Sequence, residues 1–494
     1  MPRPNPLHKE ACQSMTLHQL LDGIVADTAN YHDCAITGIT CDSRQVEAGS
    51  VFFCIKGTRA DGHDYAAAAR EKGAAAIIGA HDMGVPGQII VPDTSEAWGI
   101  AAANYFDNPA KKLKLLGVTG TNGKTSTTYI IKQILEQAGK KVGLVGTIQN
   151  EIGDMIIPSR HSTPDPYQLH ALFDRMVKAG CEYVVMEVSS HALEQKRVAG
   201  CQFLAAVFSN LTQDHLDYHG TMENYYQAKK KLFDRCDTAV INYDDETGRR
   251  LISEIDCPYV TFSCTTDTAD YIAHSIKCQP RHTNFVLLHG SSLYKVSFPI
   301  PGLFSVSNAM AAICACLAAG LSIDTILSSL SACRGIPGRI EHLDTDTPYT
   351  IIRDYAHSPD SLEKILTAVR AFATGRVVIL FGCAGNRDRT KRAVMAQTAA
   401  RLADFCILTS DNPRDEDPLH IIADAKPGFK LYRTPHKIIP DRYDAIQWAL
   451  ANSMPDDILV LAGKGHEDYQ VLQSGTIFFD EKAIVAQILA QNRK

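Results

Sequence analysis

The sequence predicts an α/β protein built from three domains. Its 494 residues exceed what one hydrophobic core usually supports, and a size of about 150 residues per domain suggests roughly three. Near-continuous apolar runs alternate with stretches that suit helices, which is typical of parallel strands buried on both faces. Most of these runs end in a polar cluster, and open α/β sheets bind ligands at the carboxyl ends of their strands.

The first block extends to about residue 110 and mixes short strands with one helix. We expect strands in GITCDSR, SVFFCIKG and GQIIVP, and an Ala-rich helix in DYAAAAREKGAAAIIGA over residues 64–80. The stretch NPAKKLK then indicates a linker to the next block.

Two further blocks repeat one pattern of apolar runs and helices. The second begins with LKLLGVTG and contains KVGLVGTI, EYVVMEVSS, FLAAVFSN and TAVINYDD. The third begins near Gly338 and Arg339 and contains TIIRDYAHS, RVVILFGCAG, FCILTSDNP and DILVLAGKG. Because the polar ends of these runs fall where parallel sheets bind ligands, we expect a reaction centre between the second and third domains.

Composition and charge exclude several classes of protein. The net charge of -6 argues against broad binding of nucleic acid or anionic membranes. The sequence contains no run of about 18 apolar residues, so it predicts no membrane span. The N-terminal MPRPNPLHKEACQSM lacks the apolar core of a secretory signal. The 15 cysteines are scattered without a CxxC motif, so we expect buried thiols in a reducing cytosol rather than zinc clusters or disulfides.

The stretch VTGTNGKTS over residues 118–126 resembles a phosphate-binding loop but departs from the strict pattern, which requires a glycine where Val118 stands. The loop lies between a predicted strand and a predicted helix, where backbone N–H groups and the helix N-terminus attract an anion. In that role Lys124 reaches the β- and γ-phosphates and Thr125 binds Mg²⁺. The alternative is an ordinary Gly-rich turn.

Three other motifs of the second block admit two interpretations each. Glu187 ends an apolar strand and is either a second Mg²⁺ ligand or a capping or salt-bridge residue. His215 and His219 are four residues apart and could share a helix face; a zinc site lacks further ligands, so hydrogen-bonded histidines are favoured. Lys229 belongs to a run of three lysines whose default interpretation is a solvated helix face.

Two motifs of the third block are also open. SDNPRDEDP places Arg414 in what is either a turn or a guanidinium presented to a carboxylate. AGKGHED contains a Gly-Lys-Gly turn that resembles a second anion loop, although a lone GxG is weak support.

Taken together, the motifs resemble the Mur ligase family of bacterial cell-wall enzymes over essentially the whole chain. The motifs in order are TCDSR, KGTRADGHDY, GTNGKTS, STPDP, MEVSSHALEQKRV, DHLDYHGTMENYYQAK, GLFSVSNAMAA, GRIE, DYAHSPDSL, GNRDRTKR, DNPRDEDP and GKGHEDYQ. GTNGKT is this family's form of the phosphate loop. The resemblance implies an N-terminal α/β uridine-nucleotide domain over residues 1–110, a central P-loop-type ATPase with a mostly parallel sheet over 111–338, and a C-terminal Rossmann-like domain over 339–494.

The implied chemistry is ATP-dependent amide formation on UDP-N-acetylmuramoyl-L-alanyl-D-glutamate, in peptidoglycan precursor synthesis. A substrate carboxylate attacks the γ-phosphate, and the amine of the added amino acid then displaces phosphate from the acyl phosphate. The transfer needs mainly positioning and charge neutralisation. The resemblance implies ATP as co-substrate, two Mg²⁺ ions, small-molecule substrates without nucleic acid, and a cytoplasmic monomer.

The resemblance also assigns the site residues. The catalytic set is Lys124, Glu187, His215 and Lys229, and Lys229 matches the lysine that is carbamylated in this family. The metal ligands are Thr125, Glu187, His215 and carbamylated Lys229. The ATP-binding residues are Gly120, Thr121, Asn122, Gly123, Lys124, Thr125, Ser126, Asn308, Arg339 and Asp354. The residues for the UDP-sugar peptide are Cys41, Ser43, Thr58, Arg59, Ala60, Ser162, Thr163, Ser189, Gln195 and Arg197; at Cys41 a bulkier aliphatic residue is expected.

The DNPR motif resembles the signature of family members that add meso-diaminopimelate rather than L-lysine. The matching residues are Arg387, Asp411, Asn412, Pro413, Arg414, Gly463 and Glu467. Arg414 suits the extra carboxylate of diaminopimelate and Glu467 suits its distal ammonium. Because lysine would leave the guanidinium unpaired, such a site can reject lysine by roughly 10⁴ or more.

Four alternatives remain open at this stage. The same ligase could use L-lysine, and a folylpolyglutamate-type ligase would share the loop and the lysine but lack DNPR and GTRADG. A nucleotide-binding regulatory or scaffold protein would need no metal ligands, and a simple kinase would stop after phosphoryl transfer.

Overall fold

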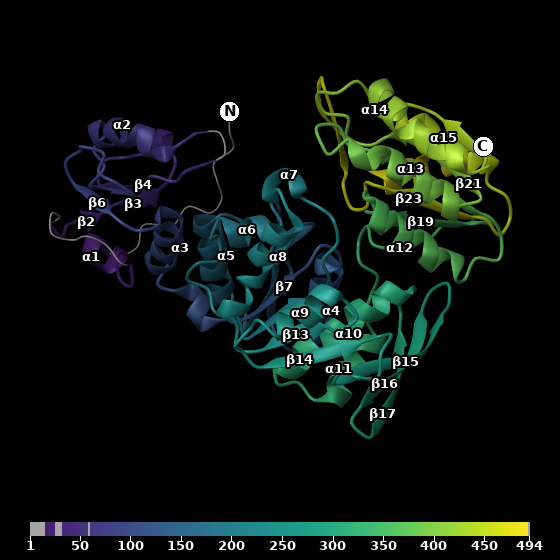
Figure 1. Ribbon diagram of the computed structural model, residues 1–494, viewed down its shortest axis with the longest axis horizontal. Coiled ribbons are helices and arrows are strands. Elements are labelled where there is room, and N and C mark those ends of the chain that lie inside the picture. Colours follow the sequence, from purple (N-terminus) through teal and green to yellow (C-terminus); the bar gives the residue numbers. More distant parts are fainter. Residues whose placement is uncertain (1–14, 25–31, 58–59, 493–494) are drawn as a thin grey trace.

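The computed structural model describes residues 15–24, 32–57 and 60–492. Figure 1 shows three lobes, with the purple N-terminal lobe and the green-to-yellow C-terminal lobe at opposite sides of the central lobe. Each lobe has its own main sheet. None of the helices in these described segments is long and apolar enough to cross a membrane.

The N-terminal lobe contains a parallel sheet of order β3-β4-β5-β6. Its elements are β1 (Met15–Thr16), α1 (Leu17–Leu20), β2 (Ala35–Ile36), β3 (Gly38–Thr40), η1 (Ser43–Gln45), β4 (Ser50–Phe53), η2 (Gly62–Tyr65), α2 (Ala66–Glu71), β5 (Ala76–Gly79), β6 (Gln88–Ile90), α3 (Thr94–Tyr105) and η3 (Pro109–Lys112). The three predicted strands of this block are confirmed as β3, β4 and β6.

The single helix predicted over residues 64–80 is wrong. Only its first half is helical, as α2, and its second half is the strand β5. Gly73 adopts φ +89, a left-handed conformation that ends the helix. The four residues of β5 are fully buried between β4 and β6, and such a strand shows no alternation that would distinguish it from a helix.

The central lobe is an eleven-stranded sheet of order β10-β9-β8-β11-β7-β12-β13-β14-β15-β16-β17. Its strands are β7 (Lys114–Thr119), β8 (Val142–Val145), β9 (Gln149–Ile152), β10 (Met155–Pro158), β11 (Tyr183–Glu187), β12 (Ala205–Phe208), β13 (Ala239–Asn242), β14 (Tyr259–Ser263), β15 (Tyr271–Cys278), β16 (Thr283–His289) and β17 (Ser292–Phe298). The predicted parallel strands are confirmed, whereas the antiparallel edges β9–β10 and β15–β17 extend the sheet beyond them.

Helices cover both faces of the central sheet and enclose two apolar cores. The helices are α4 (Lys124–Gln137), α5 (Pro166–Lys178), α6 (Ser190–Glu194), α7 (Leu216–His219), α8 (Met222–Lys230), η4 (Phe233–Arg235), α9 (Glu246–Ile252), α10 (Leu303–Ala318) and α11 (Ile323–Ser331). One core is built with α4, α10 and α11, and the other with α5, α6, α8 and α9. β7 lies between β11 and β12, so the strand order reverses where the phosphate loop leaves the sheet.

The C-terminal lobe has a six-stranded sheet of order β18-β19-β23-β20-β21-β22, in which only β18 is antiparallel. Its elements are β18 (Glu341–Leu343), β19 (Thr350–Asp354), α12 (Pro359–Arg370), β20 (Val377–Cys383), α13 (Thr390–Leu402), β21 (Phe405–Ser410), α14 (Pro418–Ala425), η5 (Lys426–Leu431), β22 (His436–Ile438), α15 (Arg442–Asn452), β23 (Ile458–Ala462), β24 (Tyr469–Leu472), β25 (Gly475–Phe478) and α16 (Glu481–Asn492). The motifs DYAHS, GKGHE, GNRD and DNPR follow four neighbouring strands and therefore share one edge of the sheet.

Candidate active site

The loop after β7 closes tightly on itself and on its neighbours. Gly120 and Gly123 adopt φ +140 and +90, and a Cβ at either position would collide, with Ser209 and with Asn308 respectively. Only glycine fits both constraints. Ser209 donates to the Asn122 carbonyl at 2.7 Å, so β12 supports the loop from outside.

Lys124 begins α4 and is folded over the loop. Its Nζ donates to the carbonyls of Gly120 and Thr121, each at 2.9 Å. Burial lowers the pKa of this ammonium, while the carboxylates of Glu187 and Asp214 oppose that effect. The cation therefore lies where phosphate oxygens would approach the backbone N–H groups of the loop.

Glu187 stands at the end of β11 and is paired in register with Val118, directly before the loop. Its buried carboxylate accepts hydrogen bonds from Thr125 Oγ1 at 3.0 Å, Thr147 N at 2.8 Å and Thr147 Oγ1 at 2.9 Å. Octahedral Mg²⁺ holds oxygens at about 2.0–2.1 Å, so neighbouring ligand oxygens lie about 2.9 Å apart. The oxygens of Thr125 and Glu187 fit that spacing.

The default expectation of a solvated face is wrong for Lys229. Its side chain is 1% exposed and donates to the Gly120 carbonyl at 2.8 Å, with Nζ 4.6 Å from the centre of the Tyr225 ring. Burial, reinforced by Lys124, holds the pKa of Lys229 well below its usual range. The neutral amine is the form that can react with carbon dioxide. Lys231, two residues on, pairs instead with Glu194 near the surface.

His215 and His219 do not share a helix face. His215 precedes α7 in a left-handed conformation, φ +53, and its ring centre lies 4.9 Å from that of His191. His219 contacts Ser190 Oγ at 2.9 Å. Burial lowers the pKa of both His215 and His219 to about 4, so each ring is neutral at pH 7 and keeps a lone pair for a ligand or donor.

Four of the residues predicted to bind the sugar peptide form one hydrogen-bonded group beside Glu187. Thr163 Oγ1 donates to the Glu187 carbonyl at 2.9 Å and lies 3.3 Å from Ser189 Oγ. Arg197 donates to the Thr163 carbonyl at 2.8 Å and twice to Gln195 Oε1. Ser162 Oγ joins the same region through Thr147 Oγ1 at 2.6 Å.

The remaining residues of that set belong to the N-terminal lobe. Thr58 and Arg59 lie outside the described residues. Cys41 is exposed. The negative charge of Asp165, in the STPDP motif of the central lobe, contributes to raising the pKa of its thiol. Ser43 begins η1 and Ala60 accepts a hydrogen bond from Gly57 N. The predicted contacts of these residues with a sugar nucleotide stay predictions.

The residues predicted to contact the nucleoside come from both larger lobes. Asn308 on α10 accepts from Thr127 Oγ1 at 3.4 Å, beside Gly123. Arg339 donates to Thr125 Oγ1 at 3.3 Å and stacks over the Tyr355 ring. Asp354 is buried and accepts from the backbone N–H groups of residues 340 and 356. Its carboxylate thus fixes the start of the C-terminal lobe to the turn that follows β19.

The DNPR turn and the GKGHE turn meet in one polar cluster. Asn412 Nδ2 donates to Glu467 Oε2 at 3.0 Å. Lys464 Nζ donates to Asn412 Oδ1 and to Glu467 Oε2, each at 2.9 Å. Gly463 is required because a Cβ there would strike Asp411. Lys464 is fully buried. The residues predicted from the sequence do not include it, and the one sequence feature that could have indicated it is the Gly-Lys-Gly turn.

Arg414 and Arg387 bring two guanidinium groups to the same place. Arg414 adopts φ +55 and donates to the Gly385 carbonyl at 2.6 Å. Burial, and then the nearby charge of Arg387, lower the pKa of Arg414. Pro413, the residue before it, accepts from Glu416 N at 3.1 Å and shapes the turn. Two neighbouring cations are suited to binding an anion.

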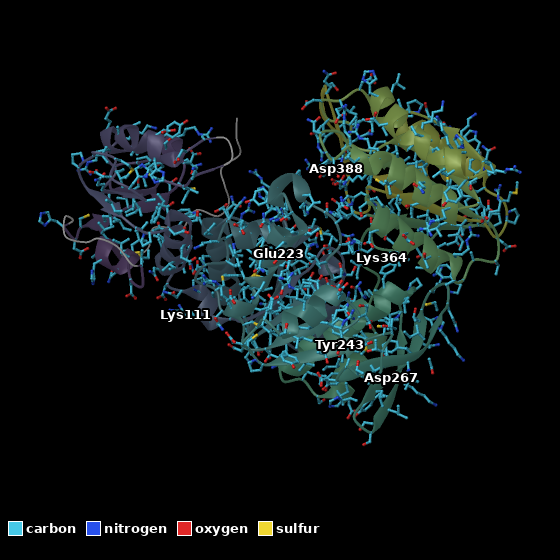
Figure 2. All side chains as sticks on the ribbon, viewed as in Figure 1. Lys111, Glu223, Tyr243, Asp267, Lys364 and Asp388 are labelled. Carbon is cyan, nitrogen blue, oxygen red and sulfur yellow. The ribbon has the colours of Figure 1, made fainter. Side chains whose placement is uncertain are left out.

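A cavity of about 510 Å³ lies between the central and C-terminal lobes. Its wall on the central side includes His191, Asp214 and His215, and its opposite wall includes His357 and Arg387. Figure 2 labels Asp388, another residue of this wall, where the C-terminal lobe faces the central lobe. A cavity therefore lies between the two α/β domains, where the sequence predicts a reaction centre, and the reaction centre itself stays a prediction.

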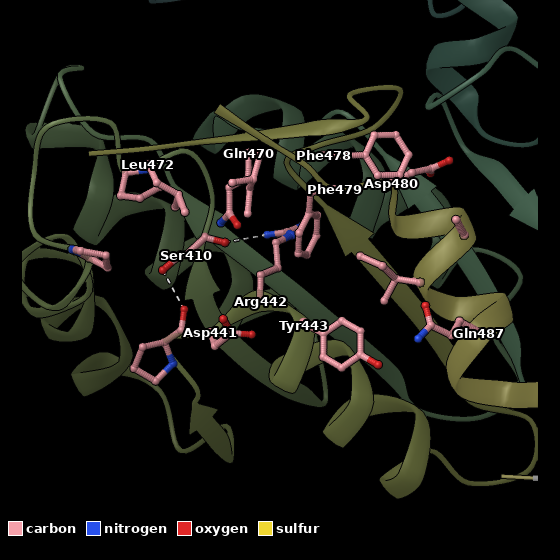
Figure 3. Close-up of a pocket in the computed structure, with 16 residues that line it drawn as sticks. Ser410, Asp441, Arg442, Tyr443, Gln470, Leu472, Phe478, Phe479, Asp480 and Gln487 are labelled. Carbon is pink, nitrogen blue, oxygen red and sulfur yellow. Dashed lines mark hydrogen bonds between the residues drawn. The ribbon is translucent and has the colours of Figure 1, made fainter. Parts of the chain in front are cut away.

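A second cavity of about 590 Å³ lies behind the DNPR turn, beside β24 and β25 (Figure 3). Arg442 is fully buried there and pairs with the equally buried Glu481 at 2.8 Å. The guanidinium also donates to the carbonyls of Ser410 at 3.1 Å and Ala462 at 2.8 Å. Arg442 thereby ties together the ends of β21 and β23, from which the Asn412–Lys464–Glu467 cluster emerges.

Three family models match the chain in succession. They are the Mur ligase family catalytic domain at residues 35–111, the Mur ligase middle domain at 118–316 and the Mur ligase glutamate ligase domain at 338–465. A UDP-N-acetylmuramoyl-L-alanyl-D-glutamate–2,6-diaminopimelate ligase of Geobacillus thermodenitrificans is 44% identical over 468 residues, covering 93% of this chain and 96% of its own. The chain belongs to the Mur ligase family.

Other relatives of this Mur ligase carry the same description. One from Caldanaerobacter subterraneus is 43% identical over 484 residues and covers 97% of this chain and 100% of its own. A solved structure of a UDP-N-acetylmuramoyl-L-alanyl-D-glutamate–2,6-diaminopimelate ligase superposes with a TM-score of 0.72 at 32% identity, over 98% of this chain and 100% of that one. The similarity thus extends over all three lobes of the Mur ligase.

Proposed function

We propose that this Mur ligase joins meso-2,6-diaminopimelate to UDP-N-acetylmuramoyl-L-alanyl-D-glutamate with cleavage of ATP, in peptidoglycan precursor synthesis. The relatives that match nearly the full chain at 43–44% identity carry the name of this reaction. The observation that supports diaminopimelate rather than lysine as the added amino acid is the pair of guanidinium groups, Arg387 and Arg414, beside the Asn412–Lys464–Glu467 cluster.

The reaction has two steps that use residues of different lobes. The terminal carboxylate of the D-glutamyl residue attacks the γ-phosphorus of ATP, the bond to the ADP oxygen breaks, and an acyl phosphate forms. The diaminopimelate amine then attacks the acyl carbon, loses a proton and expels inorganic phosphate. A carboxylate is a poor electrophile at neutral pH, so phosphorylation supplies the leaving group. Positioning and charge neutralisation provide most of the catalysis.

The residues of the central lobe serve the first step. Gly120 to Ser126 hold the phosphates, and Lys124 neutralises charge on them. Thr125 and Glu187 would hold one Mg²⁺, and His215 with carbamylated Lys229 would complete the set for two ions. Bound Mg²⁺ neutralises the negative charge of the phosphate and carboxylate oxygens. We propose Asn308, Arg339 and Asp354 as the nucleoside contacts.

The sugar peptide and the amino acid enter from the other lobes. Ser162, Thr163, Ser189, Gln195 and Arg197 lie beside Glu187, where the peptide carboxylate must arrive for phosphorylation. The uridine end is assigned to the N-terminal lobe at Cys41, Ser43, Thr58, Arg59 and Ala60. The side-chain carboxylate of diaminopimelate is assigned to Arg387 and Arg414, and its distal ammonium to Glu467.

The proposed function comes with three further assignments, which concern the domain boundaries, the location of the enzyme and its oligomeric state. We set the domain boundaries at residues 1–110, 111–338 and 339–494, because NPAKKLK and the Gly338–Arg339 turn separate the sheets. Since every substrate is a water-soluble small molecule made inside the cell, we place the enzyme in the cytoplasm. We propose that the enzyme acts as a monomer.

One assay tests the reaction. The protein is mixed with Mg-ATP, the UDP-sugar dipeptide and either diaminopimelate or L-lysine, and phosphate release and product mass are followed. We expect phosphate release that requires diaminopimelate and a product heavier by one diaminopimelate residue. Phosphate release without an added amino acid would contradict the ligase assignment, and faster turnover with lysine would contradict the amino-acid choice.

A further inference from the structure

Two loops present the paired guanidinium groups, and both loops contain an unfavourable backbone conformation. Arg387 belongs to the loop that follows β20, and Arg414 belongs to the loop that follows the neighbouring strand β21. Asn386 and Arg414 adopt φ +52 and +55, which non-glycine residues seldom adopt unless surrounding contacts hold them there.

Arg414 N donates to the Val471 carbonyl at 3.0 Å, and Glu416 holds Asn386. The two carboxylate oxygens of Glu416 accept hydrogen bonds from Arg392 Nη1 at 3.0 Å and Nη2 at 2.9 Å, which is a bidentate ion pair. The same carboxylate accepts from Asn386 N at 2.5 Å and from Arg389 at 3.0 Å. One acidic side chain of the DNPR segment therefore fastens the loop after β20 to α13.

Further bonds join the two loops directly. Gly385 N donates to the Asn412 carbonyl at 2.9 Å, and Arg414 Nη1 donates to the Gly385 carbonyl. Asn386 Nδ2 donates to Asp415 Oδ2 at 2.8 Å. The bond between Asn386 and Asp415 is exposed, and the other two are single hydrogen bonds. The Arg392 side chain is only 1% exposed, so solvent screens its bidentate ion pair with Glu416 less than it screens the exposed bond.

The charges at the site make such a tie necessary. Arg387 and Arg414 carry the same charge, and burial together with the charge of Arg387 lowers the pKa of Arg414. Without a bound carboxylate the two side chains repel one another. A fixed separation before binding means that a carboxylate does not have to order the loops, which favours affinity.

Resting on the proposed function, we propose that Glu416 and Arg392 are positioning residues that hold Arg387 and Arg414 ready for the side-chain carboxylate of diaminopimelate. Neither residue is assigned a contact with the substrate. Their effect is on the affinity for an amino acid with a second carboxylate, and on the preference for it over lysine.

The chain offers a matched control. Arg392 Nη1 forms a second ion pair of 2.9 Å with Asp424 on α14. Asp424 also faces Arg389 Nε across 3.8 Å, beyond hydrogen-bond distance, whereas Asn386 N donates to Glu416. Asp424→Asn therefore weakens the ion pairs of Arg392 without releasing Asn386. Glu416→Gln keeps the shape of the side chain and removes its charge, and Arg392→Lys keeps the charge and removes the bidentate geometry.

The experiment measures the KM for each substrate separately, together with kcat and the ratio of diaminopimelate to lysine use. For Glu416→Gln and Arg392→Lys we expect the KM for diaminopimelate to rise roughly 10- to 100-fold, the range of a hydrogen bond to a charged group. The KM for ATP and for the sugar peptide should stay unchanged, the preference over lysine should fall, and Asp424→Asn should behave as wild type. An unchanged KM for diaminopimelate in Glu416→Gln, or an equal rise for all three substrates, overturns the proposal.

A second measurement separates this proposal from the proposed function. Trypsin should cleave after Arg387, Arg389 or Arg414 faster in unliganded Glu416→Gln than in wild type and Asp424→Asn, with thermal unfolding checking that each variant is folded. If wild type fails to join diaminopimelate, the proposed function fails, and the loop-holding role is judged by cleavage alone. Equal cleavage of wild type and Glu416→Gln then overturns that role as well.

Discussion

At the scale of single residues, the three consecutive lysines at the end of α8 and directly after it show what a sequence pattern can and cannot specify. Lys229 is buried against Gly120, Lys230 pairs with Glu254 and Lys231 pairs with Glu194. Their pattern alone predicts one solvated face, because nothing local distinguishes them. The difference arises from α8 packing against the phosphate loop, a contact between segments more than a hundred residues apart. Only the family resemblance singled out Lys229.

Removing Lys229 should abolish most of the activity. We expect Lys229→Ala to lower kcat roughly 10²- to 10³-fold, the usual effect of deleting one group that stabilises developing charge. Formate or acetate should restore part of the rate by supplying the missing oxygen ligand. Lys231→Ala is the control and should retain normal rates; similar losses in both variants would contradict a special role for Lys229.

Replacing Arg414 by lysine should weaken only the binding of the added amino acid. Arg414→Lys retains the charge but cannot form two parallel bonds to a carboxylate. We expect the KM for diaminopimelate to rise by roughly tenfold or more, with the KM for ATP unchanged. Competition between labelled diaminopimelate and lysine measures the preference for one amino acid over the other. An unaltered ratio of their incorporation would show that Arg414 does not determine which amino acid is added.

At the scale of elements, the sequence predicted those strands that are buried on both faces and followed by polar motifs. β7, β11, β20 and β21 are examples, because long apolar runs and their polar ends are local signals. β5 was taken for a helix and the antiparallel edge β15–β17 was not identified, since short or half-exposed strands depend on their neighbours. Likewise, Lys464 is recognisable only once β21 and β23 lie close enough for their loops to meet.

The helices α3 and α5 join the N-terminal and central lobes, and α5 contains a buried histidine. His170 is fully buried, and its Nε2 faces the Ala199 carbonyl at 3.5 Å. Burial lowers the pKa of His170 from 6.5 to about 4. The folded protein therefore binds a proton less readily than the unfolded chain, and stability is lost as the pH falls from 6.5 towards 4.

At pH 5 this histidine should reduce the unfolding free energy of the central lobe by about 2 kcal/mol relative to pH 7.5. His170→Gln removes the titrating group, so the variant should lose less stability over that interval than wild type. Urea unfolding at both pH values measures the difference. Identical pH dependence in the two proteins would show that His170 does not titrate in this way.

At the scale of the whole molecule, the proposed function assigns three substrates to three lobes. The N-terminal and C-terminal lobes lie at opposite sides of the central lobe (Figure 1), whereas the proposed reaction requires the reacting groups to meet beside Glu187. Asn122 on the phosphate loop already donates to Asp360 on α12 at 2.6 Å, so the nucleotide loop and the C-terminal lobe are in direct contact. Binding at this contact can therefore change the position of the lobe.

We expect the lobes to move closer when substrates bind. Small-angle scattering should give a smaller radius of gyration with a non-hydrolysable ATP analogue and the sugar dipeptide than without ligands. The analogue alone serves as the control for changes confined to the phosphate loop. An unchanged radius with both ligands would mean that the unliganded arrangement is already competent.

The pairing of Arg442 with Glu481 has a consequence for how the enzyme is made. Glu481 begins α16, yet its charge holds the arginine that joins the ends of β21 and β23. During translation the phosphate loop is therefore made several hundred residues before the carboxylate that supports the C-terminal sheet. A product that terminates between the two would keep the phosphate loop but would leave Arg442 without its counter-charge, so the ends of β21 and β23 would lose the arginine-centred bonds that hold them together.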